Sequence, residues 1–174
     1  VGLPAAVADA AMSAEERAKA ETRLAGERLE GQDGKTLSLI GQARVERGDQ
    51  RLQAERIDYA QDSASASASG LVRYDDATTG FYARSARAEL ETNQTELTDV
   101  RYALKARRGQ GRAASVRTQS SVRTELSKVS YTTCPDDQPS WEIRADQIDI
   151  DHEQGTASAR GFQLRLGQIP IVYA

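Results

Sequence analysis

The sequence is poor in the residues from which most enzyme sites and thick hydrophobic cores are built. Aromatic residues make up 5% of its 174 residues, and it holds one cysteine, Cys134, and one histidine, His152. A single histidine excludes a His-rich metal cluster. We therefore expect no catalytic residues, no metal, no cofactor and no enzymatic activity. Nor does any apolar run approach the roughly 20 residues that a membrane-spanning helix needs.

Length and charge narrow the class of protein further. At 174 residues the chain is long enough for one domain and short for two ordinary ones. A hydrophobic content of 39% with few large side chains favours a thin core built from repeated small units. The net charge is -3, with both signs interspersed along the chain, which argues against a basic face for nucleic acid.

The N-terminal residues differ from the rest. Ser13 and Glu16 have the spacing of a capping box and good helix formers follow, so we expect a short helix over residues 13–24. Its faces are polar all round, which is typical of a marginal helix or a linker. We therefore predict an N-terminal tail at residues 1–24, containing this helix, and one folded domain over residues 25–174.

From residue 25 onward the sequence repeats itself. The stretch 52–59 aligns with 83–90 and with 143–150. The tripeptide Val72-Arg73-Tyr74 returns as Val100-Arg101-Tyr102 and Val129-Ser130-Tyr131, at intervals of 28 and 29 residues. The unit is therefore about 30 residues long, and a fixed period of this size indicates a stacked repeat architecture.

Within each unit, apolar and polar residues alternate with the period of two that is typical of a strand buried on one face. The alternation slips by one residue between Ala54 and Ile57, and again between Ala145 and Ile148. A slip at a fixed place keeps the side chains facing inward around a bulge or strand corner. The run 63–69, in which serine alternates with alanine, favours a strand with inward alanines over a flexible linker. We expect units that stack into two facing antiparallel sheets with open ends.

Cys134 and its surroundings carry the most specific local signal. An odd cysteine is either a buried, inert thiol or half of a bond to something outside the sequence. The turn Tyr131-Thr132-Thr133-Cys134 precedes Trp141-Glu142-Ile143-Arg144-Ala145, and Ile169-Pro170-Ile171-Val172-Tyr173 follows. In this order, the segments resemble the periplasmic part of LptD-type proteins. Residues 50–56 resemble the repeat of the OstA-like family, which LptD shares with the periplasmic bridge protein LptA.

The resemblance implies an all-β fold, the open OstA-like β-jellyroll, over residues 25–174, ending just before an outer-membrane β-barrel. It also implies a function in lipopolysaccharide transport and outer-membrane assembly. In that family the jellyroll interior receives the acyl chains of lipopolysaccharide from LptA and passes them to the LptD barrel, and through the barrel the domain is joined to LptE. The expected location is the periplasm of a Gram-negative bacterium, within an outer-membrane protein, and no nucleic acid is expected as a partner.

The resemblance also implies site residues. The alternating apolar residues would line a lipid-holding interior, although each could equally pack against its neighbours. The candidate lining residues are Leu52, Ala54, Ile57, Tyr59, Ala66, Ala68, Val72, Tyr74, Leu90, Leu97, Ile143, Ile148, Ile150, Phe162 and Leu164. The matching cysteine of the family joins this domain to the barrel through a disulfide, a role that Cys134 would take in an oxidising periplasm. The N-terminal strands are expected to accept the end of LptA by edge pairing, through Leu37, Leu39, Ala43 and Val45.

Three other interpretations stay open. A soluble LptA-like bridge protein would share the repeat, but Cys134 and the apolar C-terminal residues count against it. A right-handed β-solenoid enzyme would need paired carboxylates in a cleft and a tighter rung periodicity. A structural stack without a ligand would differ from a lipid carrier only in a lipid-binding test.

Overall fold

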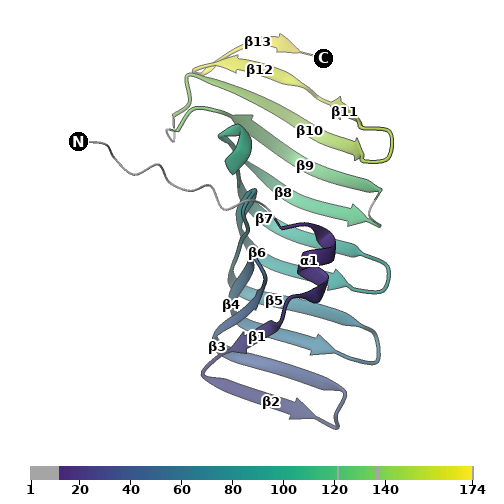
Figure 1. Ribbon diagram of the computed structural model, residues 1–174. Helices are drawn as coiled ribbons and strands as arrows, with labels where there is room; N and C mark the ends of the chain where they lie inside the picture. The colour runs from purple at the N-terminus through teal and green to yellow at the C-terminus, as the bar shows by residue number, and fades with distance from the viewer. Residues whose placement is uncertain (1–11, 121, 136–137, 174) are drawn as a thin grey trace, which may run out of the picture.

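The structure is a computed structural model that describes residues 12–120, 122–135 and 138–173. Its strands form one 13-stranded antiparallel sheet, in which the long strands follow one another in chain order. Figure 1 shows this stack, from β2 at one end to β13 at the other. The prediction of an all-β fold made of stacked antiparallel strands is confirmed.

The strands fall into two length classes. Strands β3 to β10 have 10 to 12 residues each, whereas those at the two ends have 4 or 5. The elements are α1 (Ala14–Lys19), β1 (Thr22–Ala25), β2 (Arg28–Gln32), β3 (Thr36–Arg47), β4 (Gln50–Ala60), β5 (Ser65–Asp75), β6 (Thr79–Glu89), β7 (Gln94–Leu104), the 3-10 helix η1 (Lys105–Arg107), β8 (Gly109–Gln119), β9 (Arg123–Thr132), β10 (Trp141–Asp151), β11 (Thr156–Arg160), β12 (Gln163–Leu166) and β13 (Ile169–Tyr173).

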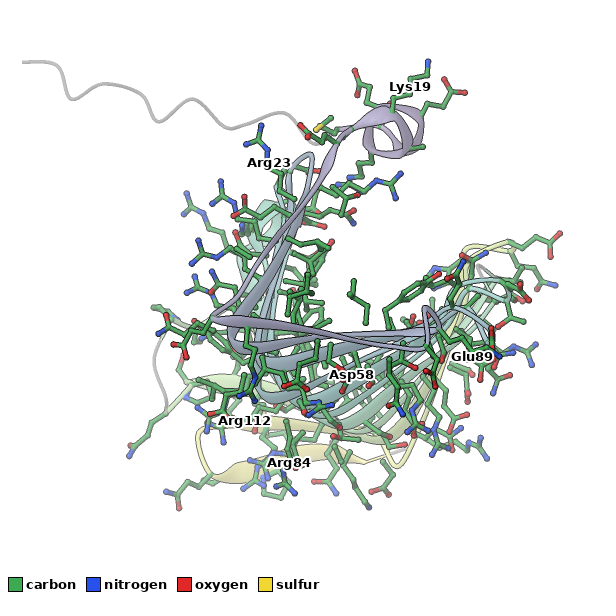
Figure 2. All side chains as sticks on the ribbon, turned by 90° about the horizontal axis from the view of Figure 1, so that it is seen from below. Lys19, Arg23, Asp58, Arg84, Glu89 and Arg112 are labelled. Carbon is green, nitrogen blue, oxygen red and sulfur yellow. The ribbon has the colours of Figure 1, made fainter. Side chains whose placement is uncertain are left out.

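Each long strand bends in its middle, so that the one sheet folds into two facing walls (Figure 2). We call the A wall the halves at residues 36–40, 56–60, 65–69, 85–89, 94–98, 115–119, 123–127 and 147–151, together with β2 and β11. The B wall comprises residues 43–47, 50–53, 72–75, 79–82, 100–104, 109–112, 129–132 and 141–144, together with β1, β12 and β13. The two facing sheets expected from the sequence are thus the two halves of a single sheet.

A column of small residues lies along the bend. Its members are only 0% to 6% exposed and form cross-strand pairs such as Val72 with Ala83. Alanine and valine suit this place because the two walls meet here, and larger side chains would force them apart. The bend column consists of Ala43, Ala54, Val72, Ala83, Val100, Ala113, Val129 and Ala145.

On alternate strands, the bend contains a residue with a left-handed backbone. Gln42, Leu71, Asp99 and Lys128 have φ angles of 45°, 49°, 48° and 50°. Each directly precedes a member of the bend column. The pairing registers of β3 to β6 also shift here, as they do where a β-bulge adds one residue to a strand. The predicted slip of one residue in the alternation is therefore the bend itself.

The N-terminal helix is shorter than the sequence predicted. Helix α1 has the expected capping box of Ser13 and Glu16, but it ends at Lys19, and Thr22–Ala25 is the strand β1. Pairing with β3 draws the β-branched Thr22 and its neighbours into the sheet instead. Residues 1–11 of the predicted tail lie outside the described residues, so the division into tail and domain stays a prediction.

Candidate functional site

The inner face of the B wall carries one ladder of side chains that runs across the strands for the whole length of the sheet. Its central part is aromatic, and the rings of Tyr74 and Phe81 stack with their centroids 5.0 Å apart. Stacked rings of this kind hold neighbouring strands together beyond their buried area. The members of the B ladder are Leu24, Val45, Leu52, Tyr74, Phe81, Tyr102, Gly111, Tyr131, Ile143, Leu164 and Val172.

The inner face of the A wall carries two parallel ladders, which are mostly aliphatic. The ladder beside the bend consists of Leu29, Leu39, Ile57, Ala68, Ala86, Leu97, Val116, Leu126, Ile148 and Ala159. The ladder nearer the turns consists of Gly31, Leu37, Tyr59, Ala66, Ala88, Thr95, Thr118, Thr124, Ile150 and Ala157. The inner face is thus aromatic on one wall and aliphatic on the other.

No member of the three ladders carries a charged side chain. Burial raises the pKa of Tyr102 to about 12, and burial together with the hydrogen bond to Asp76 raises that of Tyr74 to about 12. Both hydroxyl groups therefore stay protonated and neutral at physiological pH. On the outer faces, the charged side chains of Arg84 and Arg112 point away from the interior (Figure 2). The three ladders thus form an uncharged strip along the stack, and the charged residues nearest to it are those that meet the Tyr74 hydroxyl group at the rim of the B wall.

Gly111 in the B ladder leaves the space that the side chain of Tyr102 needs. The hydroxyl group of Tyr102 donates to the backbone oxygen of Ser130 at 2.7 Å and so reaches past Gly111. A Cβ atom at Gly111 would overlap that oxygen and approach the Tyr102 hydroxyl group to 2.7 Å. The glycines at 109 and 111, which the sequence would suggest as a turn, belong to β8, and the place of Gly111 between two tyrosines explains why it is a glycine.

Burial falls off from the bend toward the free rims of the walls. The bend column is buried, but Leu52, Tyr74 and Ile150 are only half-buried. The two walls therefore do not cover each other completely. At the ends of the stack the ladders finish in exposed apolar residues, namely Leu24 and Leu29 at one end and Val172 at the other.

Most of the predicted lining residues lie on these ladders. Leu52, Tyr74, Ile143 and Leu164 belong to the B ladder, and Ala54 and Val72 to the bend column. Phe162 is half-buried just before β12. The others, Leu90 apart, are on the A wall ladders, namely Ile57, Tyr59, Ala66, Ala68, Leu97, Ile148 and Ile150. Whether they touch a lipid remains a prediction.

The placement of Leu90 in the interior is wrong. Leu90 is 52% exposed and lies in the turn after β6, where its N–H donates to the backbone oxygen of Ala64 at 2.8 Å. The sequence alignment had set Ala83 beside Leu52, but Phe81 takes that place in the B ladder. A shift of two residues leaves every side chain on the same face, so the alternation could not reveal it.

The placement of Leu37, Leu39, Ala43 and Val45 at an edge of the sheet is also wrong. They lie on β3, which pairs with β4 along its whole length. On its other side, β2 pairs with residues 36–40 and β1 with residues 44–47. The free N-terminal edge of the sheet therefore belongs to β1 and β2. Most of β1 had been predicted as part of the helix over residues 13–24, and β2 gave only a weak copy of the repeat at residues 27–30; both strands are exposed throughout.

Several inner residues were missed although the sequence held a signal for them. Val100, Tyr102, Val129 and Tyr131 belong to the repeated tripeptides, and the structure puts each valine in the bend column and each tyrosine in the B ladder. The recurrence of Val-x-Tyr at a fixed interval was the signal, because equivalent positions in stacked repeats face the same way.

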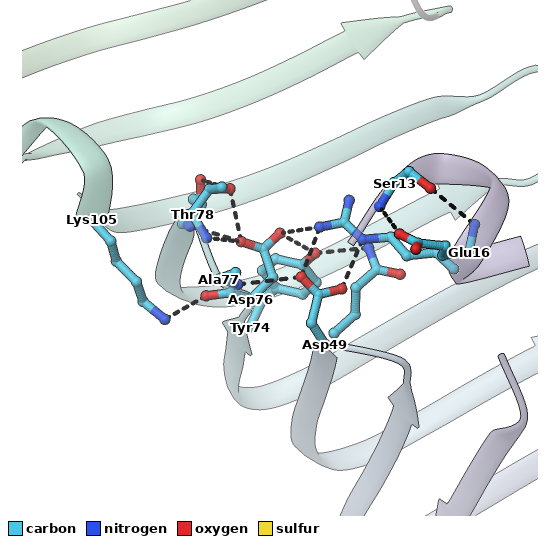
Figure 3. A network of polar contacts seen from close by, with 11 residues as sticks. Ser13, Glu16, Asp49, Tyr74, Asp76, Ala77, Thr78 and Lys105 are labelled. Atoms are coloured by element: carbon cyan, nitrogen blue, oxygen red, sulfur yellow. Dashed lines mark hydrogen bonds and ion pairs between the residues drawn. The ribbon is translucent and has the colours of Figure 1, made fainter. Parts of the chain in front are cut away.

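At the rim of the B wall a polar network holds helix α1 (Figure 3). The guanidinium group of Arg17 donates to both carboxylate oxygens of Asp49, at 2.8 and 2.9 Å. This pairing holds the pKa of Asp49 at about 2, well below its usual value. Asp76 accepts from the backbone N–H groups of Thr78 and Thr79 and from the Tyr74 hydroxyl group at 2.8, 2.7 and 2.8 Å. The network therefore links α1 to the turns and to the B ladder.

Cys134 lies just after β9 and is half-buried, so it is not the fully buried thiol that was one of its two alternatives. Its sulfur lies 3.2 Å from the hydroxyl group of Ser140. This hydrogen bond is the main reason why the pKa of Cys134 is lowered to about 7. A good share of the sulfur is then thiolate at neutral pH, the form that exchanges disulfides.

In the part of the chain that the structure describes, no helix has the length and apolar character needed to cross a membrane. Residues 24–156 match the family described as "LptA/(LptD N-terminal domain) LPS transport protein". Over 172 residues the chain is 36% identical to the LPS-assembly protein LptD of Xanthomonas euvesicatoria pv. vesicatoria, which covers 99% of this chain and 21% of that protein.

Over 150 residues it is 34% identical to LptD of Nitrosomonas eutropha, with 84% of this chain and 20% of that protein covered. The chain thus spans about a fifth of the length of these curated relatives. Among solved structures it is similar to LptH from Pseudomonas aeruginosa, described as the LptA homologous periplasmic component of the lipopolysaccharide transport device. The TM-score is 0.36 and the identity 11%, with 87% of this chain and 97% of that one covered.

Proposed function

This chain belongs to the LptA/(LptD N-terminal domain) LPS transport protein family, and on that premise we propose that it carries the acyl chains of lipopolysaccharide along its inner face. The domain would lie in the periplasm as part of an LptD-type outer-membrane protein. The observation that supports this proposal best is the set of three uncharged ladders on the inner face, which cross the long strands without a charged interruption.

The free energy of burying an acyl chain favours a conduit over a closed pocket. Burying one acyl chain of about 12 carbons at about 0.8 kcal/mol per CH₂ stabilises the complex by about 10 kcal/mol. A lipid with several acyl chains, each buried to this extent, would dissociate too slowly to be transported. The half-buried ladder residues, such as Leu52 and Ile150, offer partial burial at similar sites repeated from strand to strand. A lipid can then step between sites of nearly equal free energy.

The ends of the sheet suit a relay. An LptA-type partner would pair with the free edge formed by β1 and β2, beside the exposed Leu24 and Leu29. At the other end, β12 and β13 would lead toward the barrel that such proteins carry, and to LptE through it. The half-exposed Cys134, with a pKa of about 7, would form the disulfide to that barrel.

Photocrosslinking to lipopolysaccharide tests the proposal. A photoreactive residue is placed at Leu52 or Ile150 on the inner face, and at the adjacent Gln53 or Asp149 on the outer face. All four positions are half-buried, so each pair differs in the face and not in accessibility. Ile57 is a poorer position because it is buried in the core, where a bulky probe would disturb packing.

We expect crosslinks at Leu52 and Ile150 and few at their neighbours. Equal labelling of both members of each pair would contradict the proposal, and an absence of labelling in a protein that is assembled and active would favour the ligand-free structural stack.

A further inference from the structure

The outer faces of the two walls differ in how charged residues on neighbouring strands are paired. On the A wall, one outer column reads Arg87, Glu96, Arg117 and Glu125 on successive strands. Opposite charges therefore face each other across every strand boundary in this stretch, and Arg117 forms an ion pair with Glu96 at 2.9 Å. Alternation of this kind stabilises a sheet modestly. The four charges of this stretch therefore compensate one another, although Glu125 also lies opposite Asp149 on β10.

The corresponding outer column of the B wall contains no acidic residue. Arg101 on β7 lies directly opposite Arg112 on β8, and like charges in that position are destabilising. Both side chains are exposed, and no carboxylate among the described residues pairs with either. The members of this arginine column are Arg44, Gln53, Arg73, Tyr82, Arg101, Arg112, Ser130, Arg144 and Gln163.

The carboxylates that lie around the arginine column are already engaged. Asp75 pairs with Lys105 at 2.9 Å and Asp146 with Lys128 at 2.6 Å. Glu142 pairs with Arg144 at 2.6 Å. The positive charges of Arg101 and Arg112 are thus left without a described partner in the middle of the column, and a net charge of -3 for the whole chain conceals this local excess.

This face is also hollowed. A cleft of about 980 Å³ lies over it, and its lining includes Arg73, Tyr82, Arg101, Arg112, Arg144 and Gln163. The ion-paired carboxylates Asp75, Glu142 and Asp146 also line it. From Arg73 on β5 to Arg144 on β10 there are five strand spacings, or about 24 Å at about 4.8 Å each. The cleft is therefore long enough for several sugar units in a row and too concave for a flat bilayer surface.

We propose that this cleft binds an anionic saccharide chain, with Arg101 and Arg112 clasping its phosphate or carboxylate groups. Guanidinium groups donate two parallel hydrogen bonds to either group. The remaining members offer what sugar hydroxyl groups need: the amide of Gln163, the hydroxyl group of Ser130 and the 47% exposed ring of Tyr82, which Arg73 covers at 5.5 Å. An acidic peptide is less suited, because extended peptides dock on free backbone edges and this face presents none within the paired strands.

The proposal does not rest on lipid transport, since this cleft lies on the opposite side of the B wall from the B ladder. Its test measures binding of a fluorescent hexagalacturonate to the purified chain by anisotropy at low salt. Arg101→Gln with Arg112→Gln is compared with Arg87→Gln with Arg117→Gln, which changes the net charge equally on the A wall. Maltohexaose serves as an uncharged saccharide control, and inorganic polyphosphate serves as an anionic polymer that contains no sugar.

We expect the B wall pair to weaken hexagalacturonate binding at least about tenfold, the loss of one charge-assisted hydrogen bond or more, and the A wall pair to leave it within about twofold. Removing the facing like charges should also raise the urea midpoint slightly, whereas the A wall pair should lower it. Equal losses for the two pairs would show a net-charge effect and overturn the proposal. Tighter binding of polyphosphate, or of vesicles rich in phosphatidylglycerol, would overturn the saccharide as ligand. Lipopolysaccharide crosslinking at Ile150 is measured in the same variants, so that failure of this inference and of the lipid proposal are told apart.

Discussion

Replacement of Val72 by alanine should destabilise the protein far more than replacement of its neighbour Leu71, although leucine loses the larger side chain. Val72 is 0% exposed in the bend column, whereas Leu71 is 76% exposed. Removing two buried carbons from Val72 costs about 1.6 kcal/mol in transfer free energy. A residual cavity of about 40 Å³ adds about 1 kcal/mol. The total is about 2.5 kcal/mol, against at most about 0.5 kcal/mol for the exposed Leu71.

Urea unfolding followed by circular dichroism measures both variants. With a slope of about 2 kcal/mol per molar urea, Val72→Ala should lower the midpoint by about 1.2 M, and Leu71→Ala by no more than about 0.25 M. In thermal unfolding the valine variant should melt about 5 to 10 °C earlier. If the two variants shifted the midpoint equally, the bend column would not be the tightly packed seam described above, and the reasoning from burial would be refuted.

Three further predictions follow from the B wall. Gly111→Ala should cost about 2 kcal/mol or more in unfolding free energy, since its Cβ would overlap the backbone oxygen of Ser130 and one strand would have to move; a urea midpoint within error of the parent chain would contradict this. The Arg17–Asp49 pair depresses the pKa of Asp49 from 3.8 to about 2. Its contribution to the stability of the folded protein is therefore complete above about pH 4 and is lost as the pH falls toward 2. Asp49→Asn should speed tryptic cleavage after Lys19 at pH 8, and unchanged cleavage would mean that other contacts hold α1. Alkylation of Cys134 by iodoacetamide should be half-maximal near pH 7 and move to higher pH in Ser140→Ala, a shift that must be absent if the Ser140 hydroxyl group does not stabilise the thiolate.

The parts of the fold that the sequence predicted are those that leave a pattern in hydrophobicity. Ala54, Ile57, Ala145 and Ile148 revealed both the buried face and the bend, because a one-residue slip changes which residues are apolar. The two-residue misalignment that placed Leu90 inside changes nothing in that pattern, so only the register could correct it.

Other features left no signal of their own. Gln42, Leu71, Asp99 and Lys128 share a left-handed backbone but no chemical property, because pairing on both sides imposes the bend against their own preferences. The opposition of Arg101 and Arg112 is equally hidden. This opposition depends on which residues of neighbouring strands pair with each other, and the order of charges along the sequence does not reveal the pairing register.

The order of the long strands in space, which is their order in the chain, bears on how the molecule is made. Every long strand finds its partner in the strand just before it, so contact order is low and the slow search for distant partners is avoided. During synthesis, which proceeds from the N-terminus, each new hairpin could pair with the last strand of the sheet that has already formed. Each added hairpin would extend the stack by about 9.6 Å, two strand spacings of about 4.8 Å, and the span that such a protein bridges would then be a matter of how many hairpins its sequence encodes.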